Sequence, residues 1–384
     1  MKRLVIASFI LIVSCTGLEG FANAWDAKEA LALFCALMTF ALHIRHTPIK
    51  PLNFGVCLVV GYLLLHPLIT PPLISSNPAY TAIFDLALYK PLAQLLIYFL
   101  FFLAVSSADF SKRDIKNIIN TFCLTAIILS LYCFLQFFQL DQFHTLITTG
   151  NAPKTDGKLI TATLGHPNQC GIFIASLLPF VLLRSKKATI IPTIAILLSQ
   201  SMLAYGGAVI AFAGYLFFRG TRAHRVLLIA LGLLGSFVAV IAISKYPFLS
   251  SGRLTIWSSA WDLLIHNPHG QPRLITGYGM GTFVFLVGGT LEHPSRYMQN
   301  DALQFLFANG LIGLGGLIFL FICLLKKAIP FIMGHKEAMV FMLSFLILLA
   351  CSFGSFVFQV EPHRFFSVFL LGYLFNLTRG KQNA

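Results

Sequence analysis

Charged side chains are scarce in this chain. Lys, Arg, Asp and Glu make up only 10% of its 384 residues, whereas soluble globular proteins contain about 25%. Apolar side chains make up 57%, and the mean hydropathy is +0.83. This composition excludes an ordinary soluble enzyme and predicts an all-α integral membrane protein that crosses the bilayer many times.

Paired cysteines are also lacking. The eight cysteines are scattered singly, with no Cys-x-x-Cys pair and no cluster with histidine. Zinc sites and disulfide frameworks need such spacing, so we expect no metal and no cofactor. Acidic residues are few, 13 against 27 basic ones, which gives a net charge of +14. In a soluble chain that excess would suggest nucleic acid, but in a membrane protein topology is the better explanation.

Apolar runs of about 20 residues, enough to cross a bilayer, recur along the chain. They give about twelve candidate spans: 4–22, 28–44, 54–72, 91–107, 116–138, 167–183, 188–204, 206–218, 226–243, 301–325, 338–358 and 364–378. Only Tyr205-Gly206-Gly207 separates the seventh from the eighth, so one long broken helix is an alternative. The start of the chain, with Cys15 after a short apolar run, also resembles a lipoprotein cleavage site. A retained first helix is the simpler interpretation.

The distribution of charge favours twelve spans with both termini in the cytoplasm. With this topology the cytoplasmic side holds 18 of the 27 basic residues and three of the 13 acidic ones. Nine basic and ten acidic residues are left for the outer side. This asymmetry follows the positive-inside rule and accounts for the whole positive excess.

Two predicted outer segments are long, 139–166 and 244–300, and we expect function to reside there. Within the larger one, Ser251 to Ile265 is predicted to form a helix on the membrane surface, with one apolar stripe. The stripe consists of Leu254, Trp257, Trp261 and Leu264. Arg253 would lie in its first turn, where a guanidinium and unpaired N–H groups suit a phosphate. Alternatively, Arg253 reaches lipid headgroups.

Three short motifs flank the predicted spans. Gly277-Tyr278-Gly279-Met280-Gly281-Thr282-Phe283 follows no predicted strand, so a nucleotide-binding loop is a poor interpretation. It permits close backbone approach or a plain reversal. Asn300 or Asp301 can cap the tenth span, and His166 and Asn168 can form a capped turn before the sixth.

The order of these motifs is more specific than any one of them. Gly165-His166-Pro167-Asn168 precedes a span, Ser251-Gly252-Arg253 precedes Ile256-Trp257, and the glycine motif precedes Gln299-Asn300-Asp301-Ala302-Leu303-Gln304 and Asn309-Gly310-Leu311-Ile312-Gly313. Over roughly residues 90–378 the chain resembles the O-antigen ligase and polymerase superfamily of bacterial membrane glycosyltransferases. Twelve spans and a large periplasmic loop between helices 9 and 10 are similar to that family.

The resemblance implies a metal-independent transferase in the bacterial inner membrane. Such an enzyme moves a glycan from undecaprenyl diphosphate to an acceptor hydroxyl at the periplasmic face. Polymerases, slightly favoured here, use a second lipid-linked glycan as acceptor; ligases use lipid A–core, and related pilin glycosylases use a protein serine. Arginines hold the diphosphate and a loop histidine is thought to activate the acceptor, which is sound chemistry because a neutralised diphosphate is a good leaving group.

This sequence matches the functional residues of the family only in part. Arg253 matches the family's loop arginine, but the arginine expected near Ser199–Tyr205 is missing, so Arg273, Arg296 or Arg364 would have to replace it. Gln299 stands where the family usually has histidine, and glutamine cannot act as a base. The candidate bases are then His293, His266, His269, Asp301 and His166, and Gln299 would only orient the acceptor. The candidate substrate-binding residues are His166, Asn168 and Asn300.

A twelve-span transporter or lipid-linked oligosaccharide flippase is the alternative from another class. Transporters keep polar groups near the bilayer midplane, often at broken helices in two repeated halves. Here the spans contain almost no interior charge and the loop lengths are asymmetric. A site at the outer membrane surface therefore fits better.

Overall fold

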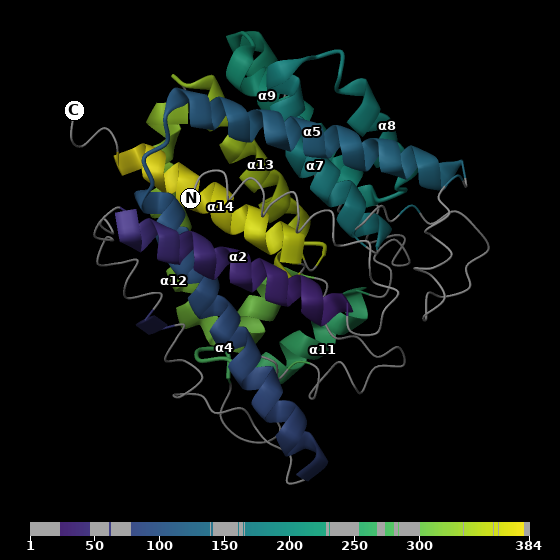
Figure 1. Cartoon of the computed structure of the whole chain (residues 1–384). Coiled ribbons are helices and arrows are strands. Elements are labelled where there is room, and N and C mark those ends of the chain that lie inside the picture. Colours follow the sequence, from purple (N-terminus) through teal and green to yellow (C-terminus); the bar gives the residue numbers. More distant parts are fainter. Residues whose placement is uncertain are drawn as a thin grey trace.

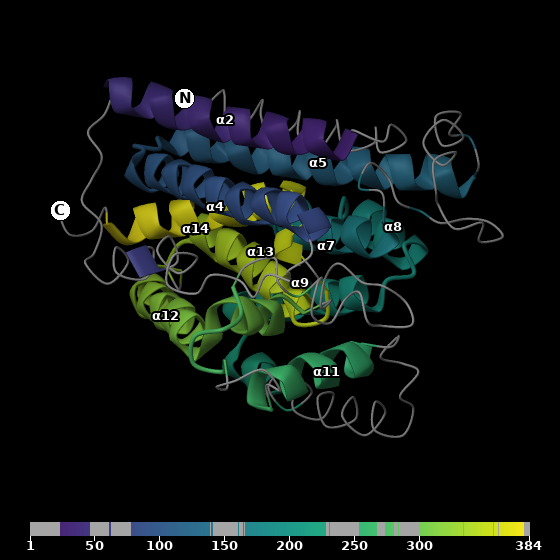
Figure 2. The same ribbon diagram turned by 90° about the horizontal axis from the view of Figure 1, so that it is seen from below.

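The computed structural model describes residues 24–46, 61–62, 78–138, 140, 160, 164, 166–227, 230, 253–266, 273–279, 283, 300–332, 334–355, 357–359 and 361–379. Within these residues the regular elements are all helices. They are α2 (Ala24–His46), α4 (Pro78–Ser107), α5 (Lys112–Phe137), α7 (Pro167–Arg184), α8 (Ile190–Leu198), α9 (Met202–Arg219), α11 (Arg253–Ile265), α12 (Asp301–Ile332), α13 (Lys336–Ser352), the 3₁₀ turn η4 (Val357–Gln359) and α14 (Glu361–Arg379). Figures 1 and 2 show them as one bundle, with α11 next to α12 on the opposite side from α5.

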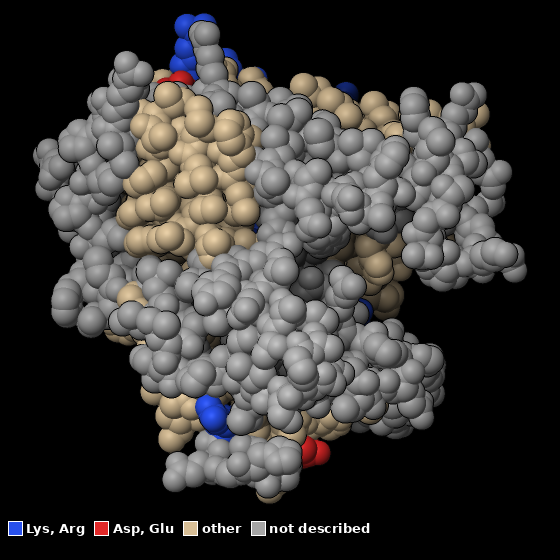
Figure 3. All heavy atoms as spheres, turned by 60° about the horizontal axis from the view of Figure 1, so that its bottom comes forward, with Lys and Arg blue, Asp and Glu red and all other residues tan. Residues whose placement is uncertain are grey.

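Among the described residues, four helices are long and apolar enough to cross a membrane: α5, α7, α9 and α12. Large apolar side chains on them are exposed, including Leu124 and Ile128 of α5 and Ile318 and Ile322 of α12. Figure 3 shows an uncharged area on the described surface of one face, with charged side chains at its upper end. A lipid environment explains such a surface. The all-helical fold is thus confirmed for the described part, which holds four candidate membrane-spanning helices, while the count of twelve spans is still a prediction.

The predicted boundary between the seventh and eighth spans is wrong by several residues. The chain reverses at Ser199-Gln200-Ser201 and not at Tyr205-Gly206-Gly207, which lies inside α9. Gln200 has a φ of 52°, a left-handed conformation that no helix interior adopts. The Ser201 hydroxyl then accepts from Ala204 N at 3.2 Å and caps α9. The side-chain cap at Ser201 therefore sets the start of α9, and the two glycines lie inside the helix.

α7 is the centre of the bundle. Every residue from Gln169 to Leu182 is buried, as expected for a helix that is apolar on all sides. Small residues allow neighbours to approach it: a Cβ on Gly171 would lie 2.5 Å from Ser199 Oγ, and one on Gly207 of α9 would lie 3.1 Å from Ala175 Cβ. The reversal at Ser199 consequently lies beside the first turns of α7.

Aromatic rings fill the space between α5, α7, α13 and α14. Phe122 contacts the rings of Phe180 and Phe366 at centroid distances of 4.9 and 5.0 Å, and Phe180 contacts Phe341 at 5.0 Å. Edge-to-face pairs of this kind contribute about 0.5–1.5 kcal/mol each beyond their burial. They fix the four helices relative to one another and so hold the polar groups at the helix ends in place.

α12 is broken at Gly310, which has φ 65° and ψ −171°. A segment from the predicted periplasmic loop, 273–279, lies against the break. Tyr278 N and Gly279 N donate to the carbonyls of Phe307 and Ala308 at 2.8 and 2.9 Å. In the opposite direction, Leu311 N and Ile312 N donate to Leu274 O and Ile275 O at 2.9 and 3.2 Å.

A third carbonyl at the break, that of Asn309, accepts from the Tyr62 hydroxyl at 3.0 Å. A bilayer offers no water to a broken helix, so each backbone group freed by the break needs a protein partner. The break in α12 is therefore stabilised by its hydrogen bonds to the 273–279 segment, and we call this contact the junction.

Candidate functional site

Polar side chains gather at one end of the bundle, where α7, α12 and α14 begin and α13 ends. We call this set the outer polar cluster. Its members are His166, Asn168, Gln169, Asn300, Asp301, Ser355, His363 and Arg364. In the predicted topology this is the outer end, and α7, α12 and α14 run from it toward basic residues such as Arg184, Lys326 and Arg379.

Asp301 and Arg364 are connected through the backbone of Phe358. Phe358 N donates to Asp301 Oδ2 at 2.9 Å, and Arg364 Nε donates to Phe358 O at 2.8 Å. Arg364 Nη1 also donates to Gln94 Oε1 of α4 at 2.8 Å, and its guanidinium lies 5.7 Å from the centre of the Tyr98 ring. Two predicted site residues that are far apart in sequence are therefore brought together. The Asp301 carboxylate accepts a hydrogen bond from a backbone N–H group there.

Gln169 and His363 form the deeper part of the outer polar cluster. Gln169 Nε2 donates to Ser355 Oγ at 3.1 Å, and His363 Nε2 lies 3.1 Å from the Gln169 carbonyl oxygen. Because a carbonyl can only accept, His363 carries its proton on Nε2. Within the described residues, Gln169 Oε1 and His363 Nδ1 are buried without a hydrogen-bond partner. Two unpartnered buried acceptors on neighbouring residues are unusual in a native interior.

Two of the three predicted substrate-binding residues, His166 and Asn300, cap helices, and the third, Asn168, lies in the first turn of α7. His166 is the N-cap of α7, and its Nδ1 accepts from Asn168 N at 3.1 Å. Asn300, and not Asp301, caps α12, because Asn300 Oδ1 accepts from Leu303 N at 3.0 Å. Capping by itself explains why a polar residue is needed at positions 166 and 300.

Arg253 is the first residue of α11 and lies in its first turn, as predicted, although the described helix begins two residues later than Ser251. It is half-buried, burial lowers the pKa of its guanidinium, and among the described residues its buried Nε has no hydrogen-bond partner. An arginine nevertheless keeps its proton at neutral pH. A partly desolvated cation with an unused donor is suited to an anionic ligand.

α11 packs on α12 through one face, which includes only Leu264 of the predicted apolar stripe among its fully buried residues. Ala260 and Leu264 are buried, with Ile256 and Leu263 packed on the same cluster, whereas Leu254 and Trp261 are 40% and 45% exposed. The cluster also includes Leu306 and Phe307 of α12 and Tyr278. The small Ala260 allows the helix to approach α12, so protein contacts set its orientation.

The glycine-rich motif makes the reversal beside α12. Arg273 O accepts from Gly277 N at 2.6 Å, and the Tyr278 hydroxyl donates to Leu263 O of α11 at 2.8 Å. Burial raises the pKa of Tyr278, while the nearby charge of Arg273 acts in the opposite direction. Arg273 is therefore close to the junction of α11 and α12.

Several predicted residues lie outside the described part of the chain. These are His269, His293, Arg296 and Gln299. His266 follows α11 directly, is exposed, and donates its backbone N–H to Asp262 O at 2.7 Å.

The sequence-based prediction missed Gln169, Ser355 and His363. Each lies within or beside an apolar span, where one polar residue is indistinguishable from a satisfied core residue. The contact between two thiols was missed for the same reason: Cys133 Sγ lies 3.5 Å from Cys170 Sγ. Within the described residues, no group of three or more His, Cys, Asp or Glu could hold a metal ion.

No known protein-family model matches this chain, and a search of curated proteins finds no significant match.

The outer polar cluster and α11 together supply cations, hydrogen-bond donors and neutral acceptors. Arg253 belongs to α11, which packs on one side of α12, and Arg364 lies at the start of α14, joined through Phe358 to the first residue of α12. Cations and N–H donors held in fixed positions can stabilise negative charge that develops on a leaving group. Such a set suits an anionic, phosphate-bearing substrate near the membrane surface.

Proposed function

We propose that this protein transfers a glycan from undecaprenyl diphosphate to an acceptor hydroxyl at the periplasmic face of the bacterial inner membrane. The observation that carries the proposal is the hydrogen-bonded link from Asp301 through Phe358 to Arg364, on the half of α12 that also packs against the Arg253 helix. Arg253, the glycine-rich motif and Asp301 belong to motifs that resemble one superfamily in sequence order, and they thereby lie along one helix, α12.

In the proposed reaction, Arg253 and Arg364 neutralise the diphosphate, with Arg273 and Arg296 as further candidates. The glycosidic bond to the diphosphate breaks and a bond to the acceptor oxygen forms, while the acceptor proton passes to a base. His293 is the first candidate base, and Gln299 orients the acceptor by hydrogen bonding. No metal or cofactor enters this scheme.

The acceptor defines the kind of transferase. We favour a polymerase, whose acceptor is a second lipid-linked glycan, over a ligase, whose acceptor is lipid A–core. A pilin glycosylase is a third member of the same class. A flippase is the alternative from another class, and the broken α12 favours it, because broken helices often line transport pathways.

Deletion of the gene in its host separates these functions. Surface glycan is sized on a gel and the periplasmic lipid-linked pool is quantified. A polymerase predicts loss of long chains with single repeats still attached, whereas a ligase predicts loss of attached glycan with long lipid-linked chains accumulating. Accumulation on the cytoplasmic side would replace the transferase by a flippase, and no change in either pool would favour a pilin acceptor.

A further inference from the structure

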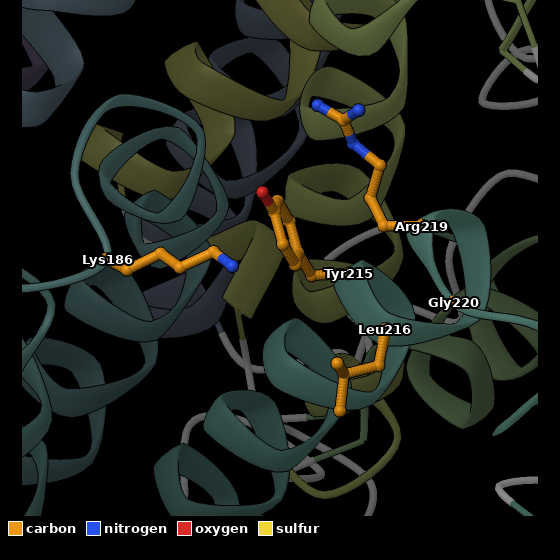
Figure 4. Close-up of a pocket in the computed structure, with 5 residues that line it drawn as sticks. All are labelled: Lys186, Tyr215, Leu216, Arg219 and Gly220. Atoms are coloured by element: carbon orange, nitrogen blue, oxygen red, sulfur yellow. The ribbon is translucent and has the colours of Figure 1, made fainter.

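A second group of polar side chains lies at the far end of α7 from the outer polar cluster. α7 has 18 residues, so the two ends are about 27 Å apart along the helix axis. Here a hollow of about 330 Å³ is lined by Lys186, Tyr215, Leu216, Arg219 and Gly220. Figure 4 shows Lys186 extending from the α7–α8 connection toward Tyr215, with Arg219 on the other side of the ring.

The backbone around this hollow is held by local hydrogen bonds. In the turn after α7, Thr189 Oγ1 donates to Lys186 O at 2.5 Å and Ala188 N donates to Ser185 Oγ at 3.3 Å. At the end of α9, Gly220 N donates to Leu216 O at 2.6 Å, and a Cβ at Gly220 would lie 2.5 Å from that oxygen. The hollow is therefore formed without a ligand.

The polar side chains that line the hollow are two cations and one neutral hydroxyl, and all three can donate hydrogen bonds. Lys186 and Arg219 are cations, the Tyr215 hydroxyl can donate, and none of the five lining residues is acidic. The Arg219 guanidinium lies 5.9 Å from the centre of the Tyr215 ring. Among the described residues, Lys186 and Arg219 have no carboxylate partner. Arg225, by contrast, is engaged, because its Nε donates to Phe217 O at 2.9 Å.

The hollow lies at the end of a candidate membrane-spanning helix. α9 is one of the four helices that can cross a bilayer, and the hollow lies at its last turn, where phospholipid headgroups would be found. Leu216, which lines the hollow, is 48% exposed and offers an apolar contact to the lipid beyond the phosphate. Basic pockets between membrane helices on the cytoplasmic side bind anionic headgroups.

We propose that this hollow binds a phosphate group, and that the phosphate is that of an anionic phospholipid. The Lys186 ammonium and the Arg219 guanidinium neutralise the phosphate oxygens, and Tyr215 donates a further hydrogen bond. The site is independent of glycan transfer, because it lies at the opposite end of α7 and uses no residue of the outer polar cluster.

Thermal unfolding of the purified full-length chain in neutral detergent tests this site. The midpoint is followed while phosphatidylglycerol, phosphatidylcholine or inorganic phosphate is added. The test variant is K186Q/R219Q. The matched control is K187Q/R222Q, which removes two exposed cations on the same side of the bundle that do not line the hollow. Y215F removes one neutral donor without changing charge.

Phosphatidylglycerol is expected to stabilise the wild type, and phosphatidylcholine is not. The half-saturating phosphatidylglycerol concentration should rise about tenfold or more in K186Q/R219Q, less in Y215F, and within about twofold in K187Q/R222Q. If inorganic phosphate stabilises the protein and this effect also depends on Lys186 and Arg219, the phosphate site stands. Its ligand would then be a soluble phosphate compound and not a phospholipid. Equal responses in the two double variants, or equal effects of both lipids, would overturn the proposal.

Discussion

The backbones of Gly277 and Gly310 approach each other so closely that neither residue has room for a side chain. A Cβ on Gly277 would lie 2.6 Å from Gly310 N, and a Cβ on Gly310 would lie 2.6 Å from Gly277 N. Both residues have positive φ, 77° and 65°, which costs other residues about 1–2 kcal/mol. This contact joins the predicted periplasmic loop to the break in α12.

Replacement of Gly310 by alanine should open this junction. The added methyl group meets the Ile275 carbonyl and the backbone conformation becomes strained, so the free energy of unfolding should fall by more than about 2 kcal/mol. Thermal unfolding in detergent measures the change. G315A is the control, since a Cβ on Gly315 in the same helix has no atom within 4 Å. An unfolding midpoint for G310A equal to that of G315A would show that the junction contributes no stability.

Asn300 has one demonstrated contact and one proposed function, and two variants separate them. N300A removes the cap of α12 and should cost about 1 kcal/mol of stability. N300S retains a capping oxygen, so it should unfold like the wild type yet transfer glycan more slowly if the side-chain amide also binds substrate. Wild-type transfer by N300S would limit Asn300 to its capping role.

Arg364 should act through its charge as well as its hydrogen bonds. R364K and R364Q both lose the paired contacts to Phe358 O and Gln94 Oε1, so their unfolding midpoints should fall by similar amounts. Lysine still binds phosphate as a point charge, so R364K should retain measurable glycan transfer and R364Q should not. Equal activity of the two variants would assign Arg364 a structural role only.

The predicted orientation can be tested with two exposed serines. Ser258 lies on α11 at the predicted periplasmic side and Ser185 follows α7 at the predicted cytoplasmic side. A membrane-impermeant maleimide applied to cells with a permeabilised outer membrane should label S258C above the wild-type background and should not label S185C. Labelling of S185C alone would reverse the topology.

The sequence predicts the apolar helices well because a long apolar run in a membrane can satisfy all its backbone hydrogen bonds by forming an α-helix. α7 begins at Pro167 as expected, and α12 begins at Asp301. The reversal at Gln200 was not predictable from composition, because a left-handed glutamine costs energy that only tertiary packing can offset. The break at Gly310 was equally hidden, since one glycine in an apolar run also fits a continuous helix.

The candidate site is only partly readable from the sequence. His166, Asn168, Asn300 and Asp301 stand at predicted helix starts, where polar residues are conspicuous. His363 and Gln169 become visible only when helices that are 194 positions apart in the chain are packed together. Likewise the apolar stripe of α11 is visible in the sequence, whereas the burial of the small Ala260 against α12 becomes visible only when the helices are packed together.

Release of the lipid carrier is the most direct measurement of the proposed function. Lipid-linked glycan extracted from the deletion host is incubated with membranes containing the wild type, R253A or, as a control at the other end of the bundle, R222A. The wild type and R222A should release undecaprenyl diphosphate as glycan is transferred, and R253A should be slower by about a hundredfold or more, because it lacks a cation for the leaving group. Release by wild-type membranes no faster than by membranes of the deletion host would contradict glycan transfer by this protein.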